Sequence, residues 1–213
     1  MMGNATIPYY LMFIPTIIVA ITGHEFAHAW LADKFGDPTA KQQGRVSLNP
    51  LVHIDPVGFL GILLVGFGWG RPVPVDAGRL RHPRAELLVS AAGPGMNLLL
   101  AALAGALLRL PGVTEGLSQT AGAWAGAAVV MFVHTNVMLA CFNFLPFFPL
   151  DGSHMVQNLL PGSLAERFRT FNRTYGYVLL MGLILSGYVL RVSPLSLLLG
   201  PPIRSITSLL LGS

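Results

Sequence analysis

The sequence predicts an all-α polytopic membrane protein with about four to six transmembrane helices. Three observations indicate this class: 53% of the 213 residues are hydrophobic, only 10% are charged, and the mean hydropathy is +0.64. A soluble domain carries about 25% charged residues. The net charge of +4 comes from basic residues scattered among apolar runs. That pattern fits membrane topology, and we expect no nucleic-acid partner.

The first predicted helix covers the apolar run from Ile7 to Trp30. No basic stretch precedes this run, and it is longer than the apolar core of a signal peptide, so we expect a retained helix. Three further apolar runs, at 87–108, 122–145 and 174–190, each approach the ~20 residues that a spanning helix needs. These four stretches are the predicted spans.

Two other apolar stretches are shorter or interrupted. The stretch from Val57 to Trp69 has only 13 residues, four of them glycine, so we expect a re-entrant segment that enters and leaves on one side. The stretch 195–211 contains two prolines and an arginine. It is either a short span or a helix that lies in the membrane interface.

The basic residues predict the orientation of the chain, because cytoplasmic loops are enriched in Lys and Arg. Both flanks of the re-entrant stretch are basic, and the loop after the third span also carries three arginines. With the first helix running inward, ten of the 13 basic residues fall on the cytoplasmic side. We therefore expect the N-terminus and the 111–121 loop outside, and the regions 32–55, 70–86 and 151–173 inside.

Short strands are predicted between the first two spans. The segments "AKQQGRVSLNP" at 40–50 and "RPVPVD" at 71–76 have the alternation and turn residues of strands. We expect them to pair at the membrane surface.

The first helix contains the pattern His24-Glu25-x-x-His28. At about 100° per residue, His24 and His28 lie one turn apart on the same helix face. Zinc favours imidazole nitrogens, and a catalytic zinc site keeps three protein ligands and an open position for water. Glu25 would take a proton from that water. The alternative is a pair of polar residues whose hydrogen bonds are satisfied inside the bundle.

The spacing of residues alone does not identify the third zinc ligand. The longer pattern with a glycine and a third histidine is absent, since Leu31 and Lys34 hold those positions. The single cysteine, Cys141, excludes a cysteine-based zinc site and an intramolecular disulfide. The remaining candidates include the other histidines and several carboxylates: His53, His82, His134, His154, Glu86 and Asp151.

Asp151 stands out among these candidates because of the stretch "FNFLPFFPLDG" at 142–152. Pro146 and Pro149 interrupt regular backbone hydrogen bonding, which membrane proteins tolerate where the chain is buried in protein or lines a cavity. An irregular segment there can fold back toward the first helix. The alternative is a helix-ending turn with a solvated Asp-Gly.

The two motifs together resemble the site-2 protease family of intramembrane zinc metalloproteases. The downstream motif is Asn143-x-x-Pro146-x-x-Pro149-x-Asp151-Gly152, and "SLNPLVHIDPVG" and "AAGPGMN" are similar to stretches of compact prokaryotic members. The resemblance covers about residues 7–155. It implies that His24, His28 and Asp151 bind one zinc ion, that Glu25 is the catalytic acid and base, and that Asn143 helps to hold the scissile carbonyl.

The resemblance also implies a substrate class, since the family cuts transmembrane proteins near the cytoplasmic side. We expect one membrane-embedded domain over 1–213, with a catalytic core at about 7–155 and C-terminal helices at about 170–211. No polar stretch is long enough for a PDZ or CBS domain. Either 71–76 or 44–50 could hold an extended substrate by strand addition, and the oligomeric state stays open.

Two other functions fit parts of the pattern. A metal transporter or metal-binding membrane protein could use the histidine pair, but it would not need Glu25, and the internal repeats common in transporters are absent. A scaffold that only binds membrane helices would be expected to have lost a ligand or the glutamate. We therefore expect a multi-pass protease of the cell membrane whose active site faces the cytoplasm and whose partners are transmembrane protein substrates and the lipid bilayer.

Overall fold

The computed structural model describes residues 7–113, 116, 123–190 and 193–212, and these residues are mainly helical. The predicted all-α class is confirmed. The N-terminus before residue 7 and most of the 111–121 loop, both predicted to face outward, lie outside the described residues. The α-helices are α1 Ile7–Lys34, α2 Thr39–Gln42, α3 Pro56–Val65, α4 Ala85–Leu108, α6 Ala123–Asn143, α7 Asp151–Leu159, α8 Gly162–Phe171, α9 Tyr177–Val189 and α10 Pro194–Leu211. The 3-10 turns are η1 Pro50–Val52 and η2 Ala77–Arg79, and η3 Asn172–Gly176 is a π-helical turn.

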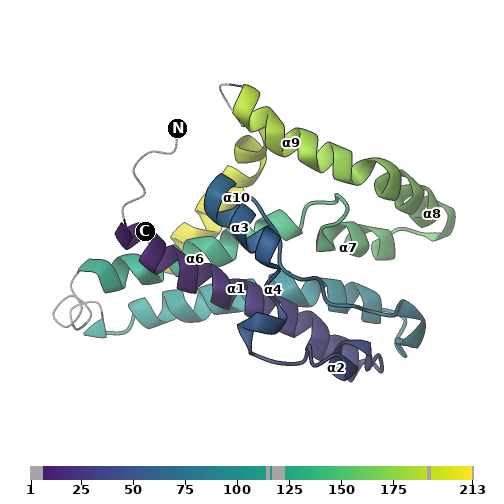
Figure 1. Cartoon of the computed structure of the whole chain (residues 1–213), viewed down its shortest axis with the longest axis horizontal. Coiled ribbons are helices and arrows are strands. Elements are labelled where there is room, and N and C mark those ends of the chain that lie inside the picture. The colour runs from purple at the N-terminus through teal and green to yellow at the C-terminus, as the bar shows by residue number, and fades with distance from the viewer. Residues whose placement is uncertain (1–6, 114–115, 117–122, 191–192, 213) are drawn as a thin grey trace.

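The long helices form the body of the molecule. In the described residues, α1, α4, α6 and α10 are long and apolar enough to cross a membrane. Figure 1 shows α1, α4 and α6 running side by side, with α10 against one end of them. The buried apolar cluster draws on α4, α6, α9, α10 and the loop after α6: Ala101, Val133, Val137, Cys141, Leu145, Leu150, Leu180, Leu199 and Ile203. The C-terminal helices therefore share a core with the helices that precede them.

The C-terminal half contains the fourth predicted span, 174–190. Most of it is helix α9, which has 13 residues and continues without a break from α8 through η3, so that helical backbone runs from Gly162 to Val189. Taken by itself, α9 is not among the four described helices that are long and apolar enough to cross a membrane. Helix α10, which the sequence left open, has the length of a span despite its two internal prolines. Neighbouring helices make such prolines tolerable in a membrane.

Helix α3 forms the hairpin expected of a re-entrant segment. Asp55 caps its first turn, and the helix ends after only ten residues at Gly66, whose φ is +72°. The chain then returns, and Gly70 pairs with Ile54 in an isolated antiparallel bridge. Both ends of the segment therefore lie together.

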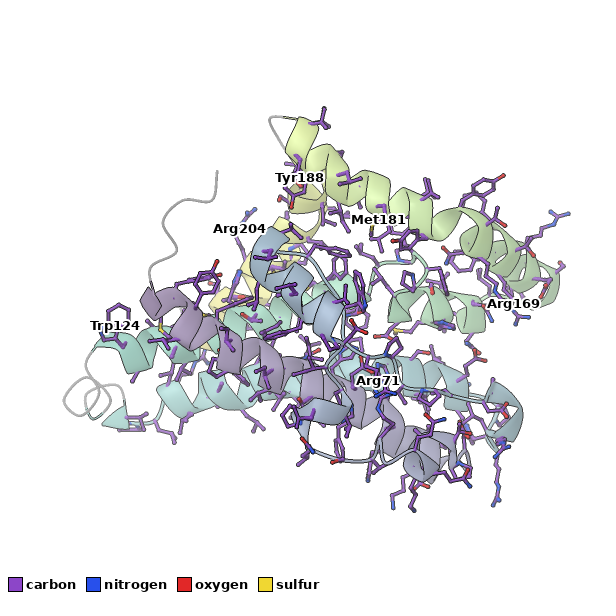
Figure 2. The ribbon with its side chains drawn as sticks, in the orientation of Figure 1. Arg71, Trp124, Arg169, Met181, Tyr188 and Arg204 are labelled. Atoms are coloured by element: carbon purple, nitrogen blue, oxygen red, sulfur yellow. The ribbon has the colours of Figure 1, made fainter. Side chains whose placement is uncertain are left out.

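Small residues let the returning chain lie directly against α3. A Cβ on Gly58 would overlap the carbonyl oxygen of Trp69, and a Cβ on Gly68 would overlap the carbonyl oxygen of Gly58. At the far end of α3, the Tyr188 hydroxyl of α9 donates a hydrogen bond to the Val65 carbonyl at 2.9 Å (Figure 2). The hairpin is thus closed by glycines and tied to α9.

The predicted pair of surface strands is absent from the described residues. Part of the first segment is helical, in α2, and apart from the Ile54–Gly70 bridge the chain forms no strand pairing there. The physical reason lies in 71–76, where Pro72 and Pro74 have no N–H to donate to a ladder. Side chains bind this segment in place of a neighbouring strand.

Candidate active site

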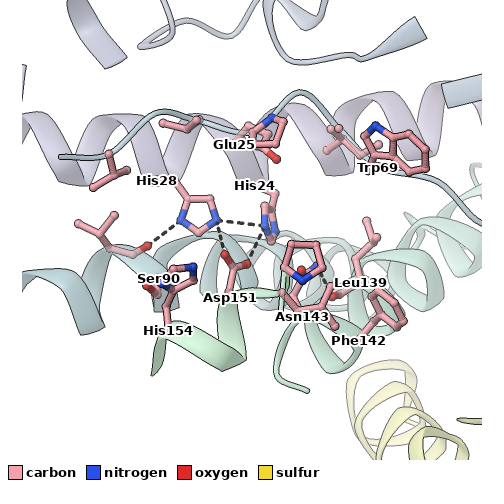
Figure 3. A pocket seen from close by; sticks show the side chains of 18 of the residues that line it. His24, Glu25, His28, Trp69, Ser90, Leu139, Phe142, Asn143, Asp151 and His154 are labelled. Carbon is pink, nitrogen blue, oxygen red and sulfur yellow. Dashed lines mark hydrogen bonds and ion pairs between the residues drawn. The ribbon is translucent and has the colours of Figure 1, made fainter. Parts of the chain in front are cut away.

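The two histidines of the first motif lie together on α1, as their spacing predicts. Both are buried, and their ring centroids are 4.7 Å apart. Their Nε2 atoms are 3.1 Å from each other (Figure 3). The helix therefore turns two nitrogen atoms toward one point.

Hydrogen bonds on the other ring nitrogens fix the tautomer of both histidines. Nδ1 of His28 lies 2.7 Å from the carbonyl oxygen of Val89, which can only accept, so the ring nitrogen donates. Nδ1 of His24 lies 2.7 Å from Oδ1 of Asn97, and Nδ2 of Asn97 donates to the Ala20 carbonyl and to Asn136. Asn97 therefore offers its oxygen to His24. In both neutral rings Nε2 is left with a free lone pair.

Asp151 adds a third acceptor to this point. Its Oδ2 lies 3.1 Å from Nε2 of His24, and its Oδ1 lies 3.4 Å from Nε2 of His28 (Figure 3). Oδ2 is buried and accepts no hydrogen bond from the described residues. A tetrahedral zinc ion with bonds of about 2.0–2.1 Å separates its ligand atoms by about 3.3 Å. The three converging acceptors thus fit a bound zinc ion.

Space for the two imidazoles comes from a glycine on the neighbouring helix α4. A Cβ on Gly93 would lie 2.6 Å from Nε2 of His24, and it would overlap Nε2 of His28. Gly93 belongs to the segment "AAGPGMN", and this close approach of α4 to α1 shows why a glycine is needed there. Any side chain at this position would displace both nitrogens.

The loop that presents Asp151 is held by a residue that the sequence did not single out. Asn172, in the π-helical turn η3, donates to the carbonyl of Pro146 at 3.1 Å and accepts from the N–H of Phe148 at 3.0 Å. It is buried, and it satisfies backbone groups that the broken helix leaves free. The sequence offered one signal for Asn172. It is a polar amide directly before an apolar run, and polar side chains in such positions usually make a structural or functional contact.

Glu25 lies beside the point where His24, His28 and Asp151 converge, and it lines the same cleft of about 400 Å³. Its Oε1 would be 3.3 Å from a Cβ at Gly70, so the returning chain after α3 packs closely on the glutamate. Part of the cleft lining is apolar and includes Ile62, Trp69 and Phe142. A carboxylate, three acceptors and an apolar groove therefore share one cavity.

Asn143 also lines the cleft, near Asp151 (Figure 3). Its side-chain nitrogen donates to the Leu139 carbonyl one turn earlier in α6, at 3.0 Å. An amide nitrogen has two hydrogens, so one donor remains. Asn136 does not reach the cleft; it is buried behind Asn97.

The other candidates for the third ligand lie outside the group formed by His24, His28 and Asp151. His53 is buried, and its ring bonds the Ser47 carbonyl. Two of the remaining histidines lie elsewhere: His82 stacks on Phe35, and His134 is exposed. Glu86 and His154 line the far part of the cleft, with 3.9 Å between Oε1 and Nδ1.

Comparison with known proteins shows which family has a sequence similar to this chain. The profile of Peptidase family M50 matches residues 111–183. A protein of Bacillus subtilis (strain 168) with the name "Putative zinc metalloprotease YwhC" is 40% identical over 196 residues, which cover 86% of this chain and 84% of that protein. The chain belongs to peptidase family M50.

More distant M50 relatives agree with this assignment. "Putative zinc metalloprotease Rip2" of Mycolicibacterium smegmatis is 33% identical over 67% of this chain, and the Rip2 protein of Mycobacterium tuberculosis H37Rv is 35% identical over the same share. In both cases the matched region spans 55% of the relative. No solved structure matches the chain.

Membership in family M50 confirms the predicted site-2 protease family, and with it a zinc metalloprotease with zinc as cofactor. The span-length helices make this M50 member a multi-pass membrane protein. Neither the transporter nor the scaffold interpretation gains support from these relatives. The roles of the individual site residues are proposed below.

Proposed function

We propose that this M50 peptidase hydrolyses peptide bonds inside the transmembrane segments of membrane-anchored proteins. The observation that carries the proposal is the position of the cleft: His24, Glu25 and His28 belong to α1, which is itself long enough to cross the membrane. A substrate that reaches these side chains has to enter the helical bundle. Such cleavage would release the soluble part of an anchored protein, which is the basis of regulated intramembrane proteolysis.

In the proposed site His24, His28 and Asp151 hold the zinc ion, and Glu25 transfers protons. Bound zinc supplies a Lewis acid and lowers the pKa of the water that attacks the peptide. Glu25 accepts a proton from the attacking water and returns it to the leaving nitrogen. Asn97 and the Val89 carbonyl keep the two histidines in the tautomer that leaves Nε2 free.

Asn143 is proposed to donate its second amide hydrogen to the oxygen of the scissile carbonyl as negative charge develops there. Its side chain lines the same cleft as Asp151, at the end of α6 (Figure 3). Preorganised donors of this kind are worth about 10²–10³ in rate. The bond to Leu139 would hold the amide in place during the reaction.

The segment 71–76, directly after Gly70, is the proposed binding strand for the substrate. Gly70, Pro72, Val73 and Val75 line the cleft, whereas 44–50, the alternative from the sequence, does not. Arg71 and Val73 precede prolines, which restricts both to extended backbone. The N–H groups of Val73 and Val75 donate to none of the described residues. They are available to an unwound substrate by strand addition.

The active site is proposed to face the cytoplasm. The arginines after α3 and Lys34, the last residue of α1, are exposed. The N–H of Arg81 donates to the Phe35 carbonyl just after α1, so this basic segment lies at the same end of α1 as His28. This side can be tested with single cysteines in a Cys141→Ala background. We expect Gly116→Cys, but not Arg79→Cys, to react with an impermeant thiol reagent added to intact cells, and the reverse pattern would contradict the orientation.

The substrate class is tested with purified protein in liposomes. The substrate is a single transmembrane segment that contains a helix-breaking residue, and its matched control has leucine in place of the breaker. We expect mass spectrometry to locate the cut within the membrane segment, with slower cleavage of the control and none after chelation of zinc. Cleavage confined to parts of the substrate outside the membrane would contradict the proposal.

A further inference from the structure

Two buried charged side chains lie next to the cleft but outside the metal-binding group. Asp37 is completely buried and Arg45 is 4% exposed. The sequence suggested only that Arg45 contributes to membrane orientation, and Asp37 had no role. A buried charge is costly unless it is paired or hydrogen-bonded, so each needs a structural reason.

Arg45 binds the backbone of the segment 71–76. Its Nη1 donates to the Pro72 carbonyl at 2.9 Å, and its Nη2 donates to the Arg71 carbonyl at 2.5 Å. The planar guanidinium fits two neighbouring acceptors at once. Its two donors satisfy carbonyls that no neighbouring strand of the described residues reaches.

Asp37 binds the other end of the same segment. Its Oδ2 accepts from the N–H of Asp76 at 2.7 Å, and its Oδ1 accepts from the N–H and hydroxyl of Thr39. Burial alone would raise the pKa of Asp37, but these hydrogen bonds outweigh it and the pKa lies below its usual value. The carboxylate is therefore charged, and both of its oxygens accept hydrogen bonds.

The start of the segment is fixed next to the catalytic glutamate. The N–H of Arg71 donates to the His53 carbonyl at 2.7 Å, next to the Gly70–Ile54 bridge. Gly70 in turn packs on Oε1 of Glu25. Whatever holds 71–76 therefore also sets the position of Val73 and Val75, which line the cleft, relative to Glu25.

We propose that Asp37 and Arg45 are positioning residues that hold the segment 71–76 so that the N–H groups of Val73 and Val75 face the substrate. This inference rests on the proposed function, since it assigns the two residues to substrate binding at the same site. Both act through the backbone of the segment and neither touches the metal-binding group. They should therefore govern the KM for a transmembrane substrate while zinc content changes little.

The test measures KM and kcat of the full-length protein with the transmembrane substrate in detergent. We expect Arg45→Ala to raise KM about tenfold, because it removes two charge-assisted hydrogen bonds. Asp37→Asn should raise KM by a smaller factor of about three. The controls are Arg84→Ala, at an exposed arginine, and Asp33→Asn, at a partly exposed aspartate that pairs with Lys41, since neither side chain contacts the segment.

A double-mutant cycle separates this role from a general effect on structure. Val73→Pro and Val75→Pro remove the two free N–H groups, and Val73→Ala and Val75→Ala control for the lost side chains. If Arg45 acts by presenting those groups, Arg45→Ala will add less than about twofold to KM in the double proline background. Equal factors in both backgrounds would overturn the proposal.

A second readout does not depend on cleavage. Hydrogen exchange at the two hydrogen-bonded amides of the segment, Arg71 and Asp76, should be at least tenfold faster in Arg45→Ala than in the wild type, whereas exchange in α4 should not change. If the alanine variant does not fold, Arg45→Lys takes its place, because lysine retains the positive charge and a single donor group. The exchange rates of Arg45→Lys should lie between those of the wild type and those expected for Arg45→Ala. Unchanged exchange with unchanged KM would refute the inference while wild-type cleavage still supported the proposed function.

Discussion

The two halves of the active site are held in place by different kinds of side chain. Around the histidines the supports are neutral: the amides of Asn97 and Asn136 and a backbone carbonyl. Around the segment 71–76 the supports are charged, namely Asp37 and Arg45. Both sets are almost completely buried.

Depth in the membrane explains this difference. Asn97 and Asn136 lie in the middle of span-length helices, where an unpaired charge would cost about 2.5–3.5 kcal/mol or more. Amides can fix an imidazole there without adding charge. Asp37 and Arg45 belong to the connection between α1 and α3, where charged groups are easier to accommodate. Substitutions in the neutral set should therefore affect the metal, and substitutions in the charged set should affect the substrate.

The largest expected effect follows the loss of a proposed ligand. Asp151→Ala should reduce zinc from about one ion per chain to near zero, because two ligands are far from the coordination that zinc prefers. Elemental analysis of the purified protein measures this, with Asp33→Ala as the control carboxylate. Full zinc content in Asp151→Ala would move the third ligand elsewhere.

A slightly smaller effect is expected from the glycine that faces the imidazoles. Gly93→Ala places a methyl group against both Nε2 atoms, so we expect zinc affinity to fall about a hundredfold. Gly95→Ala is a close control on the same helix, because a Cβ there meets nothing within 4 Å. Equal zinc affinity in the two variants would show that the histidines can move away without loss.

The neutral supports should have an intermediate effect. Asn97→Ala removes the acceptor that orients His24, and such partners are typically worth about 10–100-fold in metal affinity. Competition with a fluorescent chelator provides the measurement. The comparison with Arg45→Ala is decisive: if that variant loses as much zinc as Asn97→Ala, the division between neutral and charged supports does not hold.

The smallest effect concerns stability in acid. The pKa of Asp37 is lowered in the folded protein, so the carboxylate stabilises the fold above its unfolded pKa of about 4, and this contribution is lost as the pH falls through the folded value. Asp37→Asn should therefore lose stability at pH 6 but show a weaker acid dependence than the wild type. Thermal unfolding in detergent between pH 3 and 6 measures it, and parallel curves would contradict this role.

Local patterns in the sequence predicted the features that depend on local geometry. The spacing of His24 and His28 places both on the same face of a helix, and the prolines after Asn143 predict the irregular loop before Asp151. The re-entrant stretch was recognisable because 13 residues cannot cross the membrane.

The remaining features depend on contacts between distant parts of the chain. Asn172 binds a loop 24–26 residues earlier, and Arg45 binds backbone 26–27 residues later. The alternation in 71–76 suggested a strand in a sheet. Pro72 and Pro74 have no N–H group to donate to a neighbouring strand, and side chains form hydrogen bonds with the backbone of the segment instead. Hydropathy also left the role of 195–211 open, because it does not show that α4 and α6 pack against this proline-containing helix.

The central claim is that Glu25 transfers protons beside zinc held by His24, His28 and Asp151. The direct test compares Glu25→Gln with wild type on a transmembrane substrate, with the zinc content of both proteins measured in the same preparations. We expect the variant to keep about one zinc per chain and its normal fold, while kcat falls about a hundred- to ten-thousandfold, the usual contribution of general acid and base catalysis. Cleavage within tenfold of wild type, with zinc retained, would contradict the account.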